Sequence, residues 1–470
     1  MITVDIAKSV LTEMLQVEKS RHKLSEIVNL AWPAILQEAL NTIVNYIDTA
    51  MIGGMGAEAS AAVGLTGTVN WLVMSIPGAL GIGVLSVAAQ ANGAGDRETV
   101  RKAGQQSVFI TIVMGLILTV LCLAVSPFIV AWLGGDELIR ADATEYFVIT
   151  MIPLVFRVAN VVFSNALRGV SDMKTPMYAN LTMNIVNIVL NFFLIYPSRT
   201  VLGISIPGAG LRVTGCAIAT AVSFVMGGTM MLVAFLRNRE YMITESGLHY
   251  DRHVMSKCLG IGIPASVKRS IICFGHVAFS SMIAKLGVIP LAAHTIAIQA
   301  EQAFYIPGYG FQSAAATLAG NAVGERNKEK LRHLAFTVCL MAATLMFAAG
   351  SALFIFSEGL MGIFTPDDAV IRLGASVLKI VAVSEPVYGI LVILEGIFDG
   401  IGDTKAPVFF SIISMWGIRI LGTYLMINLF GLGLEAVWVM MVADNVSRCI
   451  MLLVRFLRGR NIDRAIEMNI

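Results

Sequence analysis

Long apolar segments, separated by short polar stretches, recur along the whole 470-residue chain. Most of them reach the length of about 20 residues that an α-helix needs to cross the hydrocarbon core of a bilayer. Because backbone N–H and C=O groups find no water inside a bilayer, such segments must form helices. The pattern therefore predicts an all-α integral membrane protein with twelve transmembrane helices. The predicted segments are residues 25–52, 58–90, 104–133, 143–167, 177–197, 207–236, 257–284, 290–322, 334–357, 370–398, 407–430 and 432–457.

The composition agrees with a membrane protein and argues against a soluble one. Hydrophobic residues make up 57% of the chain and charged residues only 14%, whereas soluble domains average about 25% charged residues. The six cysteines lie in or beside apolar segments, and no two of them form a C-x-x-C motif. Neither a disulfide framework nor a zinc site is therefore indicated. The N-terminus has no short apolar core before a small-residue cleavage site, and we expect a short cytoplasmic helix there rather than a secretory signal.

The distribution of basic residues predicts the orientation of the chain. Most of the 33 Lys and Arg residues fall in every second loop and in the two terminal segments. Cytoplasmic loops carry such an excess, so these loops and both termini are predicted to lie in the cytoplasm. We therefore expect a multi-pass protein of the cell membrane, in contact with the lipid bilayer and without a nucleic-acid partner.

An internal repeat divides the chain into two halves. At an offset of 231 residues, Pro33-Ala34 recurs as Pro264-Ala265, and the loop motif Gly169-x-x-Asp172-x-Lys174-x-Pro176 recurs as Gly400-x-x-Asp403-x-Lys405-x-Pro407. Six helices per repeat give both halves the same orientation, related by a pseudo-twofold axis along the membrane normal. The sequence thus predicts two parallel six-helix bundles. The predicted divisions are a cytoplasmic N-terminal segment (1–22), a first bundle (23–236), a cytoplasmic linker (237–256), a second bundle (257–458) and a cytoplasmic tail (459–470).

Polar side chains within the first half follow a helical spacing. They occur three or four residues apart in the first segment and again in the fifth, so each set occupies one face of its helix. Polar groups at bilayer depth are costly and usually face a cavity or the bundle interior. The two sets are Gln37, Asn41, Asn45 and Asp48 in the first segment, and Asn180, Asn184, Asn187 and Asn191 in the fifth.

If these two faces meet, Asp48 lies among carboxamide groups. Burial favours the protonated form of a carboxyl group, whereas hydrogen bonds from amides favour the ionised form, so the balance suits a group that exchanges protons. Alternatively, the carboxylate and the amide oxygens could bind Na⁺, a hard cation that prefers oxygen ligands. A third interpretation is static hydrogen bonding between helices. We expect Asp48, Asn184, Asn187 and Asn191 to couple an ion, with Gln37, Asn41 and Asn45 lining a substrate cavity.

The second half carries acidic and aromatic side chains at helical spacing. Glu301 shares a helix face with Tyr305, and Glu385 shares one with Tyr388. Carboxylates beside aromatic rings suit organic cations, through charge pairing and cation–π attraction. The alternative is an internal set of salt bridges that joins Lys268 or Arg269 to these carboxylates. The lone histidines His276 and His294 are expected to be packing residues rather than metal ligands.

Motifs for catalysis or ATP-driven transport are missing from the sequence. It contains no P-loop, and the pair Asp367-Asp368 is followed by Ala-Val-Ile rather than by the rest of an acidic pentad. We therefore expect no enzyme activity and no bound cofactor, and any transport must draw on an ion gradient.

Several motifs, taken in order, resemble the multidrug and toxic compound extrusion (MATE) family over nearly the full chain. They are Asp48-Thr-Ala-Met-Ile-Gly, Ala166-Leu-Arg-Gly-Val-Ser-Asp-Met-Lys-Thr-Pro176, Asn187-Ile-Val-Leu-Asn191, Ala292-Ala-His-Thr-Ile-Ala-Ile-Gln299 and Pro307-Gly-Tyr-Gly-Phe311.

This resemblance implies an exporter of organic cations or other xenobiotics that antiports H⁺ or Na⁺ through a V-shaped pair of bundles. The acidic residue that the family carries in the first helix corresponds to Asp48, and Pro33 matches a proline that permits this helix to bend. The polar pair of the fifth helix corresponds to Asn187 and Asn191, the second of which is Asp in some members. A glutamate that other members carry in the seventh helix is replaced here by Ile272.

We therefore predict a secondary active exporter of small organic, cationic substrates that alternates access between its two bundles and works as a monomer. The coupling ion is H⁺ or Na⁺, with Na⁺ binding possible at Asp48. One alternative is a lipid-linked saccharide flippase of the same superfamily, although such a protein would be expected to have a larger basic cavity. Another is a passive channel or receptor, which the duplicated halves disfavour.

Overall fold

The computed structural model of the chain describes residues 2–133, 137–201, 204–241, 243 and 247–468. It is built almost entirely of helices. The helices of the first half are α1 (Ile2–Gly53), α2 (Ala57–Gly93), α3 (Arg97–Trp132), α4 (Glu137–Met151), α5 (Leu154–Gly169), α6 (Lys174–Leu194) and α7 (Arg212–Leu236). Those of the second half are α9 (Arg252–Ala284), α10 (Val288–Gly324), α11 (Lys328–Ile355), α12 (Ser357–Phe364), α13 (Asp368–Ala382), α14 (Glu385–Ile401), α15 (Lys405–Ile412), α16 (Leu421–Asn428), α17 (Leu434–Arg458) and α18 (Arg460–Met468).

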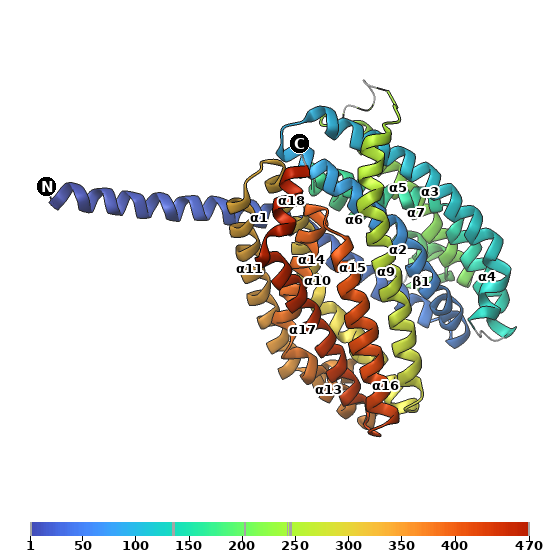
Figure 1. Ribbon diagram of the computed structural model, residues 1–470. Helices are drawn as coiled ribbons and strands as arrows, with labels where there is room; N and C mark the ends of the chain where they lie inside the picture. The colour runs from blue at the N-terminus through green and yellow to red at the C-terminus, as the bar shows by residue number, and fades with distance from the viewer. Residues whose placement is uncertain (1, 134–136, 202–203, 242, 244–246, 469–470) are drawn as a thin grey trace.

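Each of the twelve predicted segments contains helix, as expected for an all-α membrane protein. Within the described residues, eight helices are long and apolar enough to cross a membrane, or up to ten if each of two bent pairs is one span. Helices α1 and α10 complete the twelve, and they are the helices that carry Asp48 and Glu301. Figure 1 shows the helices of the first half (blue to green) beside those of the second half (yellow to red).

The N-terminal residues continue into the first membrane helix without a break. Helix α1 is 52 residues long, and Figure 1 shows its N-terminal part extending away from the packed helices. No proline precedes Pro33 and no glycine precedes Gly53, so the sequence contains no helix breaker in this stretch. The expected short N-terminal helix is therefore the beginning of α1.

Two of the predicted spans are broken near the middle. Helices α4 and α5 meet at an angle of 52°, and α13 and α14 meet at 58°. Pro153 precedes α5 directly and cannot donate a backbone hydrogen bond, and Pro386 in the first turn of α14 restricts the residue before it. The two breaks lie at equivalent positions of the repeat, so each half contains one bent span.

A short hairpin precedes the last helix of the first half. Strands β1 (Pro197–Val201) and β2 (Ile204–Ala209) pair in antiparallel fashion. The predicted span of residues 207–236 was therefore wrong at its beginning, because its first residues belong to β2 and α7 begins at Arg212. The residues around Ile204 and Ile206 are apolar and β-branched, which suits a strand as well as a membrane helix.

The eleventh span contains a stretch of π-helix. This segment, η1 (Ile413–Ile420), joins α15 to α16 and includes the buried Arg419. π-helical turns occur frequently at functional sites, because the extra residue per turn changes the direction of the neighbouring side chains.

One helix of each half packs with its N-terminal part against the other half. Ile27 and Ala31 of α1 lie in a buried cluster that otherwise consists of residues from the second half, such as Ala315 of α10. In the same way Val254 and Cys258 of α9 lie in the buried cluster of the first half. The halves therefore interlock along α1 with α10 and along α2 with α9. The predicted boundaries of the bundles at residues 23–236 and 257–458 stay a prediction.

Candidate functional site

The polar faces of α1 and α6 lie against each other. Asn184 donates from Nδ2 to Oδ1 of Asn41 at 2.8 Å, and Asn191 donates from Nδ2 to Oδ1 of Asp48 at 2.8 Å. Residues 41 and 48, and residues 184 and 191, are each seven positions apart, which is about two helical turns. The two helices therefore run parallel, and their polar residues pair at two points that are two turns apart.

Asp48 is surrounded by carboxamides. Asn191 is fully buried and also donates to Oδ1 of Asn187 at 3.2 Å. If the amide of Asn187 is turned, its nitrogen takes the place of that acceptor oxygen and donates to Oδ2 of Asp48 at 3.0 Å instead. In the part of the chain that the structure describes, no Lys or Arg forms an ion pair with Asp48. A carboxylate held only by neutral donors can take up a proton or a metal cation without first leaving a salt bridge.

Two of the predicted cavity residues lie elsewhere. Gln37 is buried within α1, and its Oε1 accepts a hydrogen bond from Nη2 of Arg168 at 3.2 Å. The side chain of Asn45 is exposed, and its contact with Thr49 involves only its backbone carbonyl. The structure therefore brings Asn41, but neither Gln37 nor Asn45, into the polar cluster with α6.

The second half contains a cluster of tyrosines around Glu301. Tyr305 donates to Oε1 of Glu301, one helical turn earlier. The ring of Tyr305 stacks on that of Tyr388 with 4.4 Å between centroids, and the hydroxyls of Tyr388 and Tyr309 are 3.2 Å apart. Three aromatic rings from α10 and α14 thus form a continuous surface beside a buried carboxylate.

Glu385 lies at the start of α14, directly after the break in that span. Its side chain is fully buried, and neither carboxylate oxygen has a hydrogen-bond partner among the described residues. A negative charge near the N-terminus of a helix is favoured by the helix dipole. Within the described ranges Glu385 makes no ion pair with Lys268 or Arg269. The alternative prediction of a salt bridge between these residues is therefore wrong for Glu385.

Buried arginines from the eleventh and twelfth spans form an ion-pair network in the second half. Arg419 pairs through Nε with Oδ2 of Asp444 at 2.7 Å. Arg448 lies 3.6 Å from both Asp444 and Glu395, and Lys268 lies 3.9 Å from Glu395. Lys268 does form a salt bridge, but with Glu395 rather than with Glu301 or Glu385. Sequence reasoning did not single out Arg419 or Arg448, although an arginine within an apolar span is itself a signal of function.

A cavity borders several of these groups. It has a volume of about 380 Å³ and lies between α1, α9, α10, α14, η1 and α17. Its ionisable lining consists of His276, Glu38, Glu301, Glu395, Arg419 and Arg448, and the three tyrosines line it as well. The cavity therefore presents both signs of charge, with aromatic rings between them.

The two lone histidines pack against aromatic rings. Trp438 donates from Nε1 to Nδ1 of His294 at 3.2 Å, and the ring of Trp71 lies edge-on to that of His276 at 6.4 Å. Among the described residues, no group of three or more His, Cys, Asp or Glu side chains could hold a metal ion.

The halves are joined by polar contacts at the loop end of α2 and α10. Gln90 donates from Nε2 to the carbonyls of Gly400 at 3.0 Å and of Ile401 at 2.9 Å. Thr317 donates to the carbonyl of Arg168 at 2.9 Å. Glycines permit this closeness, since a Cβ on Gly93 of α2 would lie 2.1 Å from the carbonyl oxygen of Asn321 in α10. The distribution of basic residues predicts that this closed end faces the cytoplasm.

Two broken spans at equivalent positions, two interlocked halves and an intramembrane carboxylate define a duplicated polytopic membrane protein of the transporter type. The family model described as MatE matches residues 33–193 and again residues 264–425. The two matches begin at Pro33 and Pro264, which are equivalent positions of the internal repeat. The chain therefore belongs to the MatE family.

Relatives and solved structures match nearly the whole chain. It is 28% identical over 441 residues to a Thermotoga maritima protein named "Probable multidrug resistance protein NorM", covering 94% of each chain. It is 22% identical over 438 residues to the Staphylococcus aureus "Multidrug export protein MepA", covering 92% of this chain and 94% of that protein. A solved structure titled "Outward-facing conformation of a multidrug resistance MATE family transporter of the MOP superfamily" is 25% identical, with a TM-score of 0.83, and the match covers 94% of this chain and 96% of that one.

Proposed function

We propose that this protein exports small organic cations from the cell by exchange for H⁺ or Na⁺, and that Asp48 carries the coupling ion. The observation that supports this most strongly is the setting of Asp48, which is held by amides of α6 and has no basic partner among the described residues. Burying an ionisable group at membrane depth costs about 2.5–3.5 kcal/mol on insertion scales. That cost is understandable if the group binds and releases an ion in each transport cycle.

The closed loop end and the cavity support an alternating-access mechanism. Contacts such as Gln90 with Gly400 seal the predicted cytoplasmic end, while the cavity lies between α1 and helices of the second half. Export requires the seal to open so that substrate can enter from the cytoplasm. Pro33 interrupts the hydrogen-bond ladder of α1 fifteen residues before Asp48 and is proposed as the hinge that lets this helix respond to its bound ion.

Charge and aromatic surface support a cationic substrate. In the ion-pair network, Arg419 and Arg448 are compensated by Asp444 and Glu395. Glu301 and Glu385 stand outside this network, and Glu301 borders the tyrosine surface in the cavity. A planar organic cation can stack on these rings while a carboxylate balances its charge.

The Asp48→Asn variant tests this proposal, with uptake of a fluorescent cationic dye into inside-out vesicles as the readout. We expect Asp48→Asn to abolish dye transport driven by a proton or a sodium gradient, since Asn cannot exchange a charge. Asp48→Glu should keep part of the activity, and Asp142→Asn, which changes an exposed carboxylate of α4, should keep all of it. Full gradient-driven transport by Asp48→Asn would refute the role of Asp48. Dye flux through the wild type that depends on neither the proton gradient nor the sodium gradient would favour a passive channel.

A further inference from the structure

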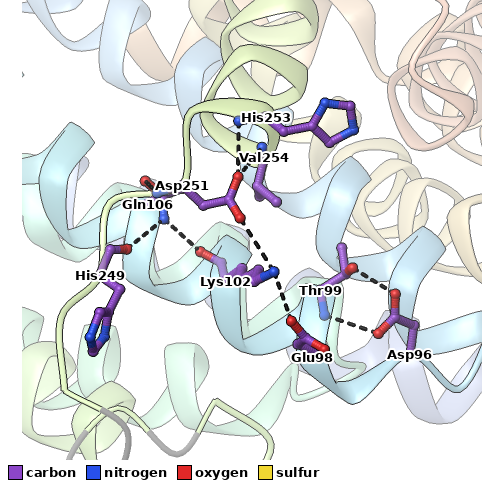
Figure 2. A network of polar contacts seen from close by, with 9 residues as sticks. All are labelled: Asp96, Glu98, Thr99, Lys102, Gln106, His249, Asp251, His253 and Val254. Carbon is purple, nitrogen blue, oxygen red and sulfur yellow. Dashed lines mark hydrogen bonds and ion pairs between the residues drawn. The ribbon is translucent and has the colours of Figure 1, made fainter.

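The linker between the halves is held tightly on α3 of the first half. Gln105 donates from Nε2 to the carbonyl of Gly247 at 2.7 Å, and Gln106 donates from Nε2 to the carbonyl of His249 at 3.0 Å. The Oε1 atom of Gln106 accepts a hydrogen bond from the backbone N–H of Asp251 at 3.2 Å. Figure 2 shows Gln106 beside His249 and Asp251. Both glutamines are buried. Their amides therefore replace the backbone partners that residues 247–251 would otherwise find in water.

Asp251 ties this segment to α9 and to α3 at once. Its Oδ1 accepts from the backbone N–H groups of His253 at 2.9 Å and Val254 at 3.1 Å, which caps the first turn of α9. Its Oδ2 lies 3.3 Å from Nζ of Lys102, which also pairs with Glu98 on the same helix (Figure 2). The hydrogen bond from Val254 is the largest cause that lowers the pKa of Asp251 below its ordinary value, and Lys102 contributes as well.

Buried contacts continue this attachment into the core of the first half. Tyr241, earlier in the linker, is fully buried and donates from its hydroxyl to the carbonyl of Ala166 at 2.5 Å. Its ring fills a notch left by Gly104 of α3, where a Cβ would lie 2.3 Å from Cδ1 of the ring. Val254 and Cys258 of α9 join the same buried cluster.

Helix α9 changes its neighbours on either side of Pro264. Before the proline, Cys258 and Gly262 pack against α2, where a Cβ on Gly83 would lie 2.1 Å from the carbonyl oxygen of Cys258. After the proline, Phe279 and Ile283 belong to a buried cluster of the second half. The helix therefore begins in one half and ends in the other, and its proline interrupts the hydrogen-bond ladder between the two parts.

We propose that residues 247–262 act as a strap that fixes the first turns of α9 to the first half throughout the transport cycle. The contact between α2 and α9 is then permanent, although it joins residues from the two repeats. The seal that opens consists of the contacts of α2 with α10 and α14, such as the hydrogen bond from Nδ2 of Asn92 to Oδ1 of Asn321 at 3.2 Å. The boundary between the two parts of the protein that move relative to each other then lies within α9, near Pro264. The linker between the halves is part of the first of these and does not act as a flexible connection.

This inference rests on the proposed transport function but can be measured without it. In a cysteine-free background, a reversible short thiol cross-linker joins either Lys102→Cys to Asp251→Cys or Asn92→Cys to Asn321→Cys. Both pairs have side chains in direct contact. We expect the first cross-link to change dye transport by less than twofold and the second to reduce it at least tenfold until a reductant is added. Equal loss of transport with both cross-links would overturn the strap, because the strap would then have to open.

A distance measurement keeps the two ideas separate. With spin labels on the same two pairs, we expect one distance between residues 102 and 251 at high and at low pH and with or without the dye. Between residues 92 and 321 we expect two distances whose populations shift with these conditions. Two distances for the first pair would refute the strap even in a protein that transports. Loss of transport in the variants before cross-linking, with the spin-label distances as expected, would count against the proposed function and leave the strap supported.

Discussion

The seal between the two halves depends on the side chain of Gln90 in α2. Gln90 makes two hydrogen bonds to the second half, to the carbonyls of Gly400 and Ile401. Gln90→Leu removes both and leaves the two carbonyls without these donors. At about 0.5–1.5 kcal/mol for each net hydrogen bond, the closed form loses about 1–3 kcal/mol. Such a difference corresponds to a shift of about 5- to 150-fold in the equilibrium between closed and open forms.

Reaction of a cysteine buried in the seal measures this shift. Thr404 is buried and donates at 3.0 Å to the carbonyl of Ile261, in the part of α9 that packs on the first half, so Thr404→Cys reports on opening. We expect a membrane-impermeant maleimide, added on the cytoplasmic side of a cysteine-free background, to react at least fivefold faster when Gln90→Leu is present. The control Asn428→Leu removes a hydrogen bond within α16 only and should leave the rate unchanged. An unchanged rate in Gln90→Leu would refute the assignment of these contacts as a seal.

Three further predictions concern stability. Glu395→Gln leaves Arg448 without one of its two carboxylates, and since breaking a buried ion pair costs about 3–5 kcal/mol, the Tm in detergent should fall by several degrees; an unchanged Tm would mean that the network is dispensable. Gly104→Val forces a side chain into the ring of Tyr241, and we expect a lower Tm and faster proteolysis of the linker. Proteolysis of the variant at the same rate as the wild type would contradict this expectation. The pKa of Asp251 is lowered in the folded state, so the ionised carboxylate contributes to stability above its ordinary pKa of about 4, and this contribution is lost as the pH falls below that value. Asp251→Asn should therefore remove part of the loss of stability in acid. An identical dependence of stability on pH in the variant and the wild type would contradict this role of Asp251.

The arrangement of helices could be predicted from the sequence because the membrane imposes a simple rule on it. Apolar length gave the twelve spans, and the recurrence of Pro33 as Pro264 gave the two halves. The hairpin before α7 was missed, because Ile204 and its neighbours satisfy the same apolar criterion whether they form a strand or a helix. The exchange of helix ends was also beyond sequence reasoning, since it depends on which helices pack together rather than on the pattern within any one of them.

The candidate site was predicted more completely in the first half than in the second. Equal spacing of amides on two helices indicated that Asp48 would lie among carboxamides if the two faces met, and the structure contains a hydrogen bond from Asn191 to Asp48. In the second half, sequence spacing placed Glu301 beside Tyr305 correctly, but the partners of the basic residues depend on contacts between distant helices. Arg419 lies on a π-helical turn, and its direction could not be derived from a regular helical period.

Counting the ions that leave the purified protein when substrate binds tests the coupling role of Asp48. In weakly buffered detergent solution, addition of a cationic dye should release protons or, in sodium-loaded protein, sodium ions. Asp48→Asn should bind the dye and release none. Ion release of the same size from wild type and Asp48→Asn, or dye binding without any release from wild type, would contradict the account.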